Sequence, residues 1–242
     1  MEQKFLKIES NVCIAADVYE MKLIGDVSAI TAPGQFVNIK LDGLYLRRPI
    51  SVCDWEEGSL TLIYKVVGEG TKVMSALEPG KVLDVLVGLG NGFDTSKSGN
   101  MPLLIGGGVG TPPMYGLCKR LLAEGKKPTV ILGFNSERDV FFKEAFEALG
   151  IPVRITTVDG SCGIKGFVTD AMDMDYSYTY ACGPIPMLRA IYNRSAVSGQ
   201  YSFEERMGCG FGACMGCSCK TKYGNLRICK DGPVLEKEII IW

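Results

Sequence analysis

The sequence predicts an antiparallel β-barrel, then a doubly wound parallel α/β domain, then a small cysteine-rich C-terminal domain. Residues 1 to about 95 contain short alternating apolar runs separated by Gly, Pro and Asp clusters, which is typical of antiparallel strands. From Met101 onward, apolar strand-like runs alternate with helical segments, and this alternation indicates a parallel sheet. Five of the ten cysteines lie between residues 209 and 229.

The first unit, residues 1–96, is expected to form a small closed barrel with one short helix at 72–76. Pro33-Gly34 and Asp42-Gly43 are favourable turns between strands. The clearest strand candidates are residues 12–16, 18–23, 35–40, 60–67 and 81–87.

The second unit, residues 97–200, begins after the short polar segment 96–100. A buried strand from Pro102 leads into a glycine loop, and further strands and helices follow in alternation. The expected strands are 129–134, 153–158 and 178–182, and the expected helices are 114–123, 140–149, 167–172 and 186–195.

The third unit, residues 201–242, has two strand-like runs at 226–229 and 238–242. It is too small to fold on its own apolar core, so a bound metal group could stabilise its fold.

Composition excludes several classes of function. Charge is balanced at 26 basic and 27 acidic residues, so no nucleic-acid partner is expected. The N-terminus lacks the apolar core of a signal peptide and no apolar run approaches membrane-spanning length, so we expect a cytoplasmic protein without a membrane partner. Histidine is absent, which excludes Ser-His-Asp and Cys-His catalysis and mixed His-Cys metal sites. Hydride and electron transfer on cofactors remain possible.

The strongest motif is Cys209, Cys214, Cys217 and Cys229, spaced C-x4-C-x2-C-x11-C. Thiolates ligate iron–sulfur clusters, and the x4-x2 spacing opens the plant-type [2Fe-2S] pattern. The alternative is a structural zinc site, but zinc ribbons usually have two C-x2-C pairs and this chain has one. Cys219 follows Cys217 too closely, because the plant-type pattern takes its fourth ligand from a distant return of the chain.

Two glycine-containing loops are candidates for nucleotide binding. Gly106-Gly-Gly-Val-Gly110 follows a buried strand, where backbone N–H groups can approach a diphosphate, although a tight turn without a ligand is the alternative. Cys182-Gly-Pro184 ends another strand of the same sheet, so both loops are expected to line one crevice. In the first unit, Arg47 and Arg48 suit a diphosphate, although such a pair is more often solvated surface. Gly68–Thr71 is a second, weaker phosphate candidate.

These residues together resemble the ferredoxin-reductase superfamily and, within it, the electron-transfer subunits of class B dihydroorotate dehydrogenase. The resemblance covers nearly the whole chain and rests on the order and spacing of the motifs. They are Pro33-Gly-Gln-Phe36, Arg48-Pro-Ile-Ser51, Ile63-Tyr-Lys65, Gly68-Glu-Gly-Thr71, Gly90-Asn-Gly-Phe93, Gly106–Gly110, Asp159–Gly166, Cys182-Gly-Pro184 and Glu204–Cys209.

The resemblance implies that FAD binds the barrel, NAD(H) binds a Rossmann-like second domain, and a [2Fe-2S] cluster binds the C-terminal domain. The implied FAD contacts are Arg48, Pro49, Ile50, Ser51, Ile63, Tyr64, Lys65, Gly70 and Thr71. The implied NAD contacts are Gly106, Gly107, Gly108, Gly110, Cys182, Gly183 and Pro184, with Cys182 near the nicotinamide either tuning hydride transfer or packing. The implied cluster ligands are Cys209, Cys214, Cys217 and Cys229.

Residues 135–138 follow the second parallel strand, at the place where the ribose of a bound nucleotide would be recognised. Glu137 suits a 2′-hydroxyl and Arg138 suits a 2′-phosphate, and the resemblance favours NAD.

The implied function is an electron conduit of pyrimidine biosynthesis. Electrons would pass between NAD(H), FAD and the cluster to the FMN of a separate subunit that interconverts dihydroorotate and orotate, in a heterotetramer with two copies of each chain. One alternative is a subunit of a ferredoxin:NADP reductase or sulfide dehydrogenase, which differs only in its partner. A non-enzymatic alternative is a zinc-bound interaction module.

Overall fold

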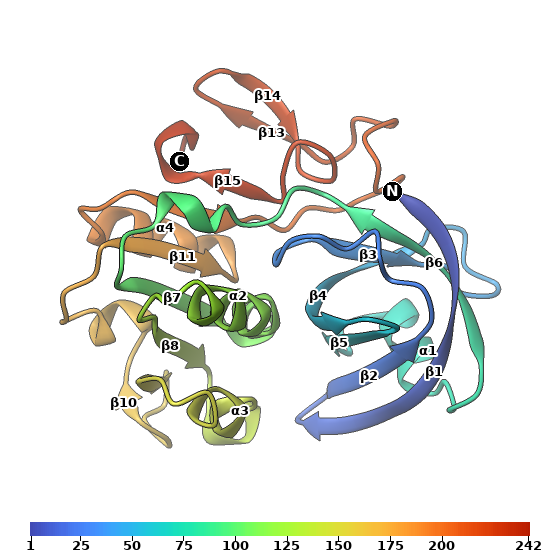
Figure 1. Ribbon diagram of the computed structural model, residues 1–242, viewed down its shortest axis with the longest axis horizontal. Coiled ribbons are helices and arrows are strands. Elements are labelled where there is room, and N and C mark those ends of the chain that lie inside the picture. Colours follow the sequence, from blue (N-terminus) through green and yellow to red (C-terminus); the bar gives the residue numbers. More distant parts are fainter.

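A computed structural model describes residues 1–242 as a barrel beside an α/β sheet, with the C-terminal segment across one end of both (Figure 1). The barrel is closed in the strand order β1-β2-β5-β4-β3-β6. Its core holds 17 buried apolar residues, including Leu6, Met21 and Leu62. Its elements are β1 (Glu2–Ala15), β2 (Val18–Ile24), β3 (Phe36–Ile39), β4 (Arg48–Glu56), β5 (Ser59–Lys65), α1 (Glu69–Ser75) and β6 (Val82–Leu89).

Two barrel strands differ from the sequence prediction. β1 begins at Glu2 rather than at residue 12, and it was missed because only Leu6 and Ile8 of its first half are buried, so its apolar alternation is short. β4 was not among the clearest strand candidates, although a strand start was expected at residues 46–51, because it opens with Arg48 and Pro49. In β6, by contrast, every second residue from Leu83 to Leu89 is buried, and this period of two made the strand visible in the sequence.

The second lobe contains a seven-stranded sheet in the order β10-β9-β8-β7-β11-β12-β15. The first six strands are parallel and β15 is antiparallel to β12. The strands are β7 (Pro102–Gly107), β8 (Thr129–Phe134), β9 (Val153–Thr157), β10 (Ile164–Lys165), β11 (Tyr178–Cys182), β12 (Gly199–Ser202) and β15 (Val234–Glu236). The chain reverses its direction across the sheet between β7 and β11, where doubly wound sheets bind ligands.

Helices cover both faces of this sheet. α2 (Thr111–Ala123) and α3 (Lys143–Glu147) pack on one face, and α4 (Ile185–Arg194) packs on the other. α2 also contacts β4, so one apolar cluster joins the two lobes. A Cβ on Gly116 would lie 2.6 Å from the carbonyl oxygen of Cys53, which shows how closely α2 approaches the barrel.

Several expected elements are shorter or absent. The expected helix 140–149 is reduced to α3, and the expected helix 167–172 is a single 3-10 turn, η4 (Val168–Ala171). The expected strand 238–242 is wrong: residues Lys237–Ile239 form the 3-10 turn η5. This run is apolar because it packs against the rest of the chain and not because it forms a strand; Trp242, for example, contacts the rings of Tyr192 and Phe203.

The C-terminal segment is not separate from the sheet. The proposed limit between residues 200 and 201 lies inside β12, and β15 returns from the C-terminal segment to pair with β12. The rest of that segment carries a hairpin of β13 (Ser218–Thr221) and β14 (Gly224–Arg227). The proposed limit between residues 96 and 97 lies in the 3-10 turn η1 (Thr95–Lys97), between barrel and sheet.

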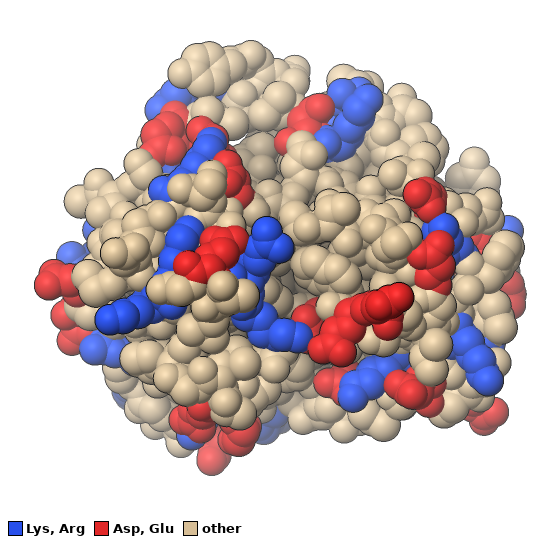
Figure 2. Space-filling view, in the orientation of Figure 1, with Lys and Arg blue, Asp and Glu red and all other residues tan.

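Basic and acidic side chains are interspersed on the face seen in Figure 2, where short blue and red groups alternate between large uncharged areas. No helix of the chain is long and apolar enough to cross a membrane.

Candidate functional site

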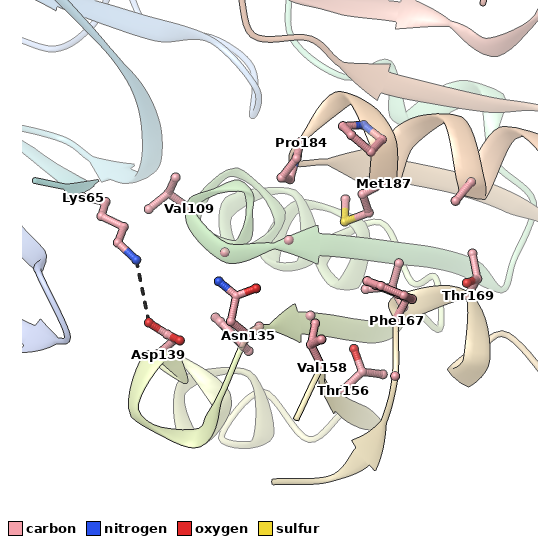
Figure 3. Close-up of a pocket in the computed structure, with 18 of the residues that line it drawn as sticks. Lys65, Val109, Asn135, Asp139, Thr156, Val158, Phe167, Thr169, Pro184 and Met187 are labelled. Atoms are coloured by element: carbon pink, nitrogen blue, oxygen red, sulfur yellow. Dashed lines mark ion pairs between the residues drawn. The ribbon is translucent and has the colours of Figure 1, made fainter. Parts of the chain in front are cut away.

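A cavity of about 440 Å³ lies at the carboxyl ends of the parallel strands (Figure 3). Its walls come from the glycine loop after β7, the ends of β8 and β9, and the start of α4. Gly107, Gly108 and Pro184, three of the residues expected to contact the nucleotide, line it. The structure therefore brings the two predicted loops together at one crevice.

Glycine is required where the two loops meet. A Cβ on Gly110 would lie 2.1 Å from the carbonyl oxygen of Cys182, and a Cβ on Gly107 would lie 2.4 Å from the sulfur of Met187. Gly108 adopts φ +51° at the turn, with open space where a side chain would be. α2 begins at Thr111, but Pro112 and Pro113 have no N–H, so the glycine loop rather than the first turn of this helix would offer N–H groups to a diphosphate.

Cys182 ends β11 and is only 3% exposed. Burial raises the pKa of its thiol to about 12, so the sulfur stays protonated at neutral pH. Its side chain belongs to the apolar cluster that joins the lobes. The surroundings therefore favour packing over a redox or nucleophilic role for this thiol.

The sequence missed several polar residues of the crevice. Asp139 lines it and lies 3.7 Å from the ammonium of Lys65, an ion pair that joins the two lobes (Figure 3). Thr156 also lines it, and its buried hydroxyl has no hydrogen-bond partner. Glu137 and Arg138 do not line this cavity, although the sequence suggested them as ribose contacts. Thr156 carries no local sequence signal, since only the pairing of β9 with β8 places it there.

In the barrel, the structure separates the roles of the paired arginines. Arg47 donates to both carboxylate oxygens of Asp84, at 2.9 and 3.0 Å, and is therefore already neutralised. Arg48 has no carboxylate partner, and its side chain lies against Gly70, where a Cβ would be 1.8 Å from Nε. The hydroxyl of Thr71 accepts from the N–H of Val67 at 2.9 Å and so fixes the turn before α1. Arg48, Gly70 and Thr71 thus meet at one place, and because the Arg48 guanidinium donates to the carbonyls of Leu46 and Arg47 but pairs with no carboxylate, its charge is available to a phosphate.

The remaining residues of the expected flavin site fall into two groups. Pro49, Ile50 and Ser51 are half-buried along β4. Ile63 and Tyr64 are buried, each 3% exposed. The Tyr64 hydroxyl donates to Oδ1 of Asn11 at 2.8 Å, so its ring is held in the barrel core. At this end of β5, Lys65 is the residue whose side chain reaches the crevice.

The four cysteines expected to be ligands lie in what we term the cysteine segment, residues 209–229. They lie in two pairs. The sulfur of Cys209 accepts from the N–H of Cys214 at 3.5 Å, and the sulfur of Cys217 accepts from the N–H of Cys229 at 3.4 Å. Cys217 and Cys229 are buried, whereas Cys214 is exposed. In this structure no three Cys, Asp or Glu side chains gather closely enough to hold a single metal ion.

Backbone N–H groups are directed at these sulfurs. Burial opposes ionisation of Cys209, but N–H groups of Cys214, Phe211 and Ala213 outweigh it and lower the pKa of that thiol to about 6. Burial, reinforced by neighbouring Cys217, raises the pKa of Cys229 to about 12. Positive φ angles in the segment turn these N–H groups inward; they occur at Gly210 (+80°), Gly212 (+91°) and Met215 (+62°).

Paired thiols with N–H donors fit a group that has two metal centres. Cys219 lies in β13 outside both pairs, with its sulfur 3.7 Å from the carbonyl of Lys220.

Comparison with known families gives two matches along the chain. Residues 204–241 match the iron-sulfur cluster binding domain of dihydroorotate dehydrogenase B. Residues 104–193 match the oxidoreductase NAD-binding domain. The two matches contain the cysteine segment and the two loops of the crevice.

Curated relatives match almost end to end. A protein of Fusobacterium nucleatum is 44% identical over 244 residues, covering 94% of each chain. One of Bacillus pumilus is 44% identical over 253 residues, covering 98% of each chain. Both are named dihydroorotate dehydrogenase B (NAD(+)), electron transfer subunit.

Solved structures share the fold. A chain from an NADH-dependent reduced ferredoxin-NADP oxidoreductase, described in work on flavin-based electron bifurcation, superposes with a TM-score of 0.90 at 30% identity. That comparison covers 98% of this chain and 90% of the other. A ferredoxin NADP+ reductase from Neisseria gonorrhoeae with bound FAD and NADP gives a TM-score of 0.70 at 14% identity, covering 80% and 90% of the two chains, and shows the fold alone.

Proposed function

Because this chain belongs to the family of dihydroorotate dehydrogenase B electron transfer subunits, we propose that it carries electrons between NAD(H) and a separate catalytic subunit. It is an NAD-linked oxidoreductase subunit that uses FAD and a [2Fe-2S] cluster. The physical task of such a chain is to hold three redox groups in series.

One observation carries this proposal: the barrel contacts both other sites. At the end of β5, Lys65 reaches Asp139 in the nucleotide crevice. On β3, Asn38 donates to the backbone carbonyl of Cys209, which begins the cysteine segment. A flavin on the barrel would therefore lie between the nucleotide and the cluster.

We infer the residues that would hold each group from the family resemblance together with their positions in the fold. For FAD they are Arg48, whose charge no carboxylate neutralises, with Gly70 and Thr71, together with Pro49, Ile50 and Ser51 of β4; the side chains of Ile63 and Tyr64 would shape the barrel from within. For NAD(H) they are the loops Gly106–Gly110 and Cys182–Pro184. When bound, FAD supplies hydride exchange with NAD(H), and the cluster, on Cys209, Cys214, Cys217 and Cys229, supplies one-electron transfer.

The proposed partner is an FMN-containing subunit that interconverts dihydroorotate and orotate, with two copies of each chain in the complex. The names of the relatives support a catalytic partner. The cytoplasmic location stays a prediction of the sequence.

The experiment that tests this function is co-expression of the chain with a dihydroorotate-oxidising subunit from the same genome. We expect a brown-yellow complex, with stoichiometric flavin and iron, that forms NADH from dihydroorotate and NAD+. A Cys217→Ser chain is the matched control, because it removes one buried thiol and should abolish that reaction.

The solved relative at 30% identity supports a second candidate, a subunit of a ferredoxin:NADP oxidoreductase. A complex that reduces ferredoxin but leaves dihydroorotate unchanged would favour this candidate. A colourless chain containing only zinc would contradict both.

A further inference from the structure

Two asparagines, one in the barrel and one just after it, are bonded to the start of the cysteine segment and to the residues that follow its end. Asn38, in β3, is 1% exposed and donates its side-chain N–H to the carbonyl of Cys209 at 3.3 Å. Asn91, just after β6, donates its side-chain N–H to the carbonyls of Lys230 and Asp231, at 3.3 and 3.1 Å. The first bond lies at the first thiol and the second lies just past the last thiol.

At the first end, the backbone of the segment lies directly on the amide of Asn38. Gly210 adopts φ +80°, and a Cβ there would be 2.3 Å from Nδ2 of Asn38. Asn38 is itself fixed, because its carbonyl accepts from Arg47 at 3.3 Å and Arg47 is bonded to Asp84. Oδ1 of Asn38 is buried without a partner, so the side chain is held through its N–H alone.

At the second end, the link is both backbone and side chain. The N–H of Asn91 donates to the carbonyl of Gly232 at 2.6 Å. Gly90 adopts φ +71°, and a Cβ there would be 2.6 Å from Cδ of Pro233. The motif Gly90-Asn-Gly-Phe93, which neither the crevice nor the flavin site uses, therefore serves to clamp residues 230–233.

The strands that carry these amides adjoin the expected flavin strand. β3 lies between β4 and β6, and Asn38 is the direct cross-strand partner of Pro49. Phe36 of β3 likewise pairs with Ser51 of β4 and with Leu89 of β6. Loss of either amide would therefore move the thiols relative to β4 without changing a ligand of either cofactor.

We propose that Asn38 and Asn91 are positioning residues that set the separation between the flavin and the cluster. This inference rests on the proposed function, because it needs both cofactors. The affected step is the transfer of one electron from reduced flavin to the oxidised cluster, whose rate depends on their distance. NADH supplies two electrons as a hydride and leaves as NAD+; one of these electrons passes to the cluster and the other stays on the flavin.

The test uses the purified chain with flavin and cluster bound, and compares wild type with Asn38→Asp and Asn91→Asp. Each change preserves the shape of the side chain, removes its N–H donors, and places an oxygen against a carbonyl oxygen. After rapid mixing with NADH, we expect flavin reduction at the wild-type rate and cluster reduction slowed about tenfold or more. The EPR spectrum of the reduced cluster should also change.

A second measurement needs no cofactor. In the iron-free chain, hydrogen exchange should become faster around Cys209 in Asn38→Asp and around residues 230–233 in Asn91→Asp. The matched control is Lys237→Met, which removes two bonds from a side chain to the carbonyls of Ser195 and Val197, away from the cysteine segment. It should leave the rate of cluster reduction unchanged.

The inference is overturned if both asparagine variants reduce the cluster at the wild-type rate. It is also overturned if Lys237→Met slows the step equally, because general loosening would then explain the effect. If Asn38→Asp loses both cofactors, the exposed Asn91 variant decides by the same two criteria. A wild-type chain whose cluster NADH does not reduce would instead contradict the proposed function.

Discussion

The nucleotide crevice and the cysteine segment are held together in different ways. The crevice lies at the ends of β7, β8 and β11, whose side chains are almost all buried, so regular packing forms it before any ligand arrives. Residues 203–217 contain no helix or strand, and Phe211 and Met215 are 42% and 52% exposed. Hydrogen bonds to sulfur and contacts from the barrel hold this part. A nucleotide that binds and dissociates would enter a preformed cavity. A permanently bound cluster, by contrast, would contribute to the structure that binds it.

The largest expected effect is that of Cys217→Ser in the cysteine segment. Cys217 is 1% exposed, and its sulfur accepts the N–H of Cys229, so a hydroxyl there loses both a ligand and a buried contact. We expect complete loss of bound iron, measured by metal analysis and EPR, with NADH binding unchanged. Cys219→Ser is the matched control and should keep its iron. Equal iron content in Cys217→Ser and Cys219→Ser would contradict this distinction between the two thiols.

The converse change is Gly110→Ala in the crevice. The new Cβ would meet the backbone carbonyl of Cys182, which cannot move as a side chain can. We expect the free energy of unfolding to fall by about 3 kcal/mol and the KM for NADH to rise, with iron content preserved. Urea denaturation and steady-state kinetics measure these effects.

Gly108→Ala is the control for that variant. Its φ of +51° costs about 1 kcal/mol, but no atom lies within 4 Å of the added methyl group. A Gly110→Ala chain no less stable than Gly108→Ala would show that the crevice is not closely packed.

A smaller effect is expected at the barrel, which joins the two regions. Gly70→Ala should displace Arg48, because the new Cβ would overlap its Nε. We expect FAD affinity to fall about tenfold, equivalent to about 1.4 kcal/mol, when measured by flavin fluorescence. Gly68→Ala adds a methyl group in open space at an extended φ of −169° and should bind FAD as wild type does. Equal affinities would argue against a flavin contact by Arg48.

The smallest expected effect is a difference in alkylation between one thiol of each region, measured in the iron-free chain. Alkylation of Cys209 should show a midpoint near its pKa of about 6, whereas Cys182, with a pKa of about 12, should not react at neutral pH. Because folding lowers the pKa of Cys209, its contribution to stability is present above the unfolded value of about 8.5 and is lost as pH falls through about 6. Mass spectrometry of alkylated peptides over pH 5–9 gives the Cys209 midpoint and shows whether Cys182 reacts. A Cys209 midpoint near 8.5 would show that its N–H donors do not act on the sulfur.

Much of the fold was predictable because it depends on local pattern. The strands 129–134 and 178–182 were predicted with the bounds that the structure has, since each is a short apolar run between turn signals. The order of barrel, parallel sheet and cysteine segment followed from the change in the pattern of apolar residues along the chain and from the spacing of the cysteines. The strand β4 was not among the clearest candidates, because it opens with Arg48 and Pro49 and its burial depends on α2, which comes later in the chain.

The sequence by itself determined which chemical groups are present: four closely spaced thiols, two glycine loops, two arginines and no histidine. Only the tertiary structure decided that Arg47 is neutralised by Asp84 while Arg48 has no carboxylate partner. It also decided that β15 returns to the sheet, and that Asn38 contacts Cys209 across 171 residues of chain. Such contacts join residues that are far apart in sequence, so no local period or spacing encodes them. They become visible only when the strands are paired.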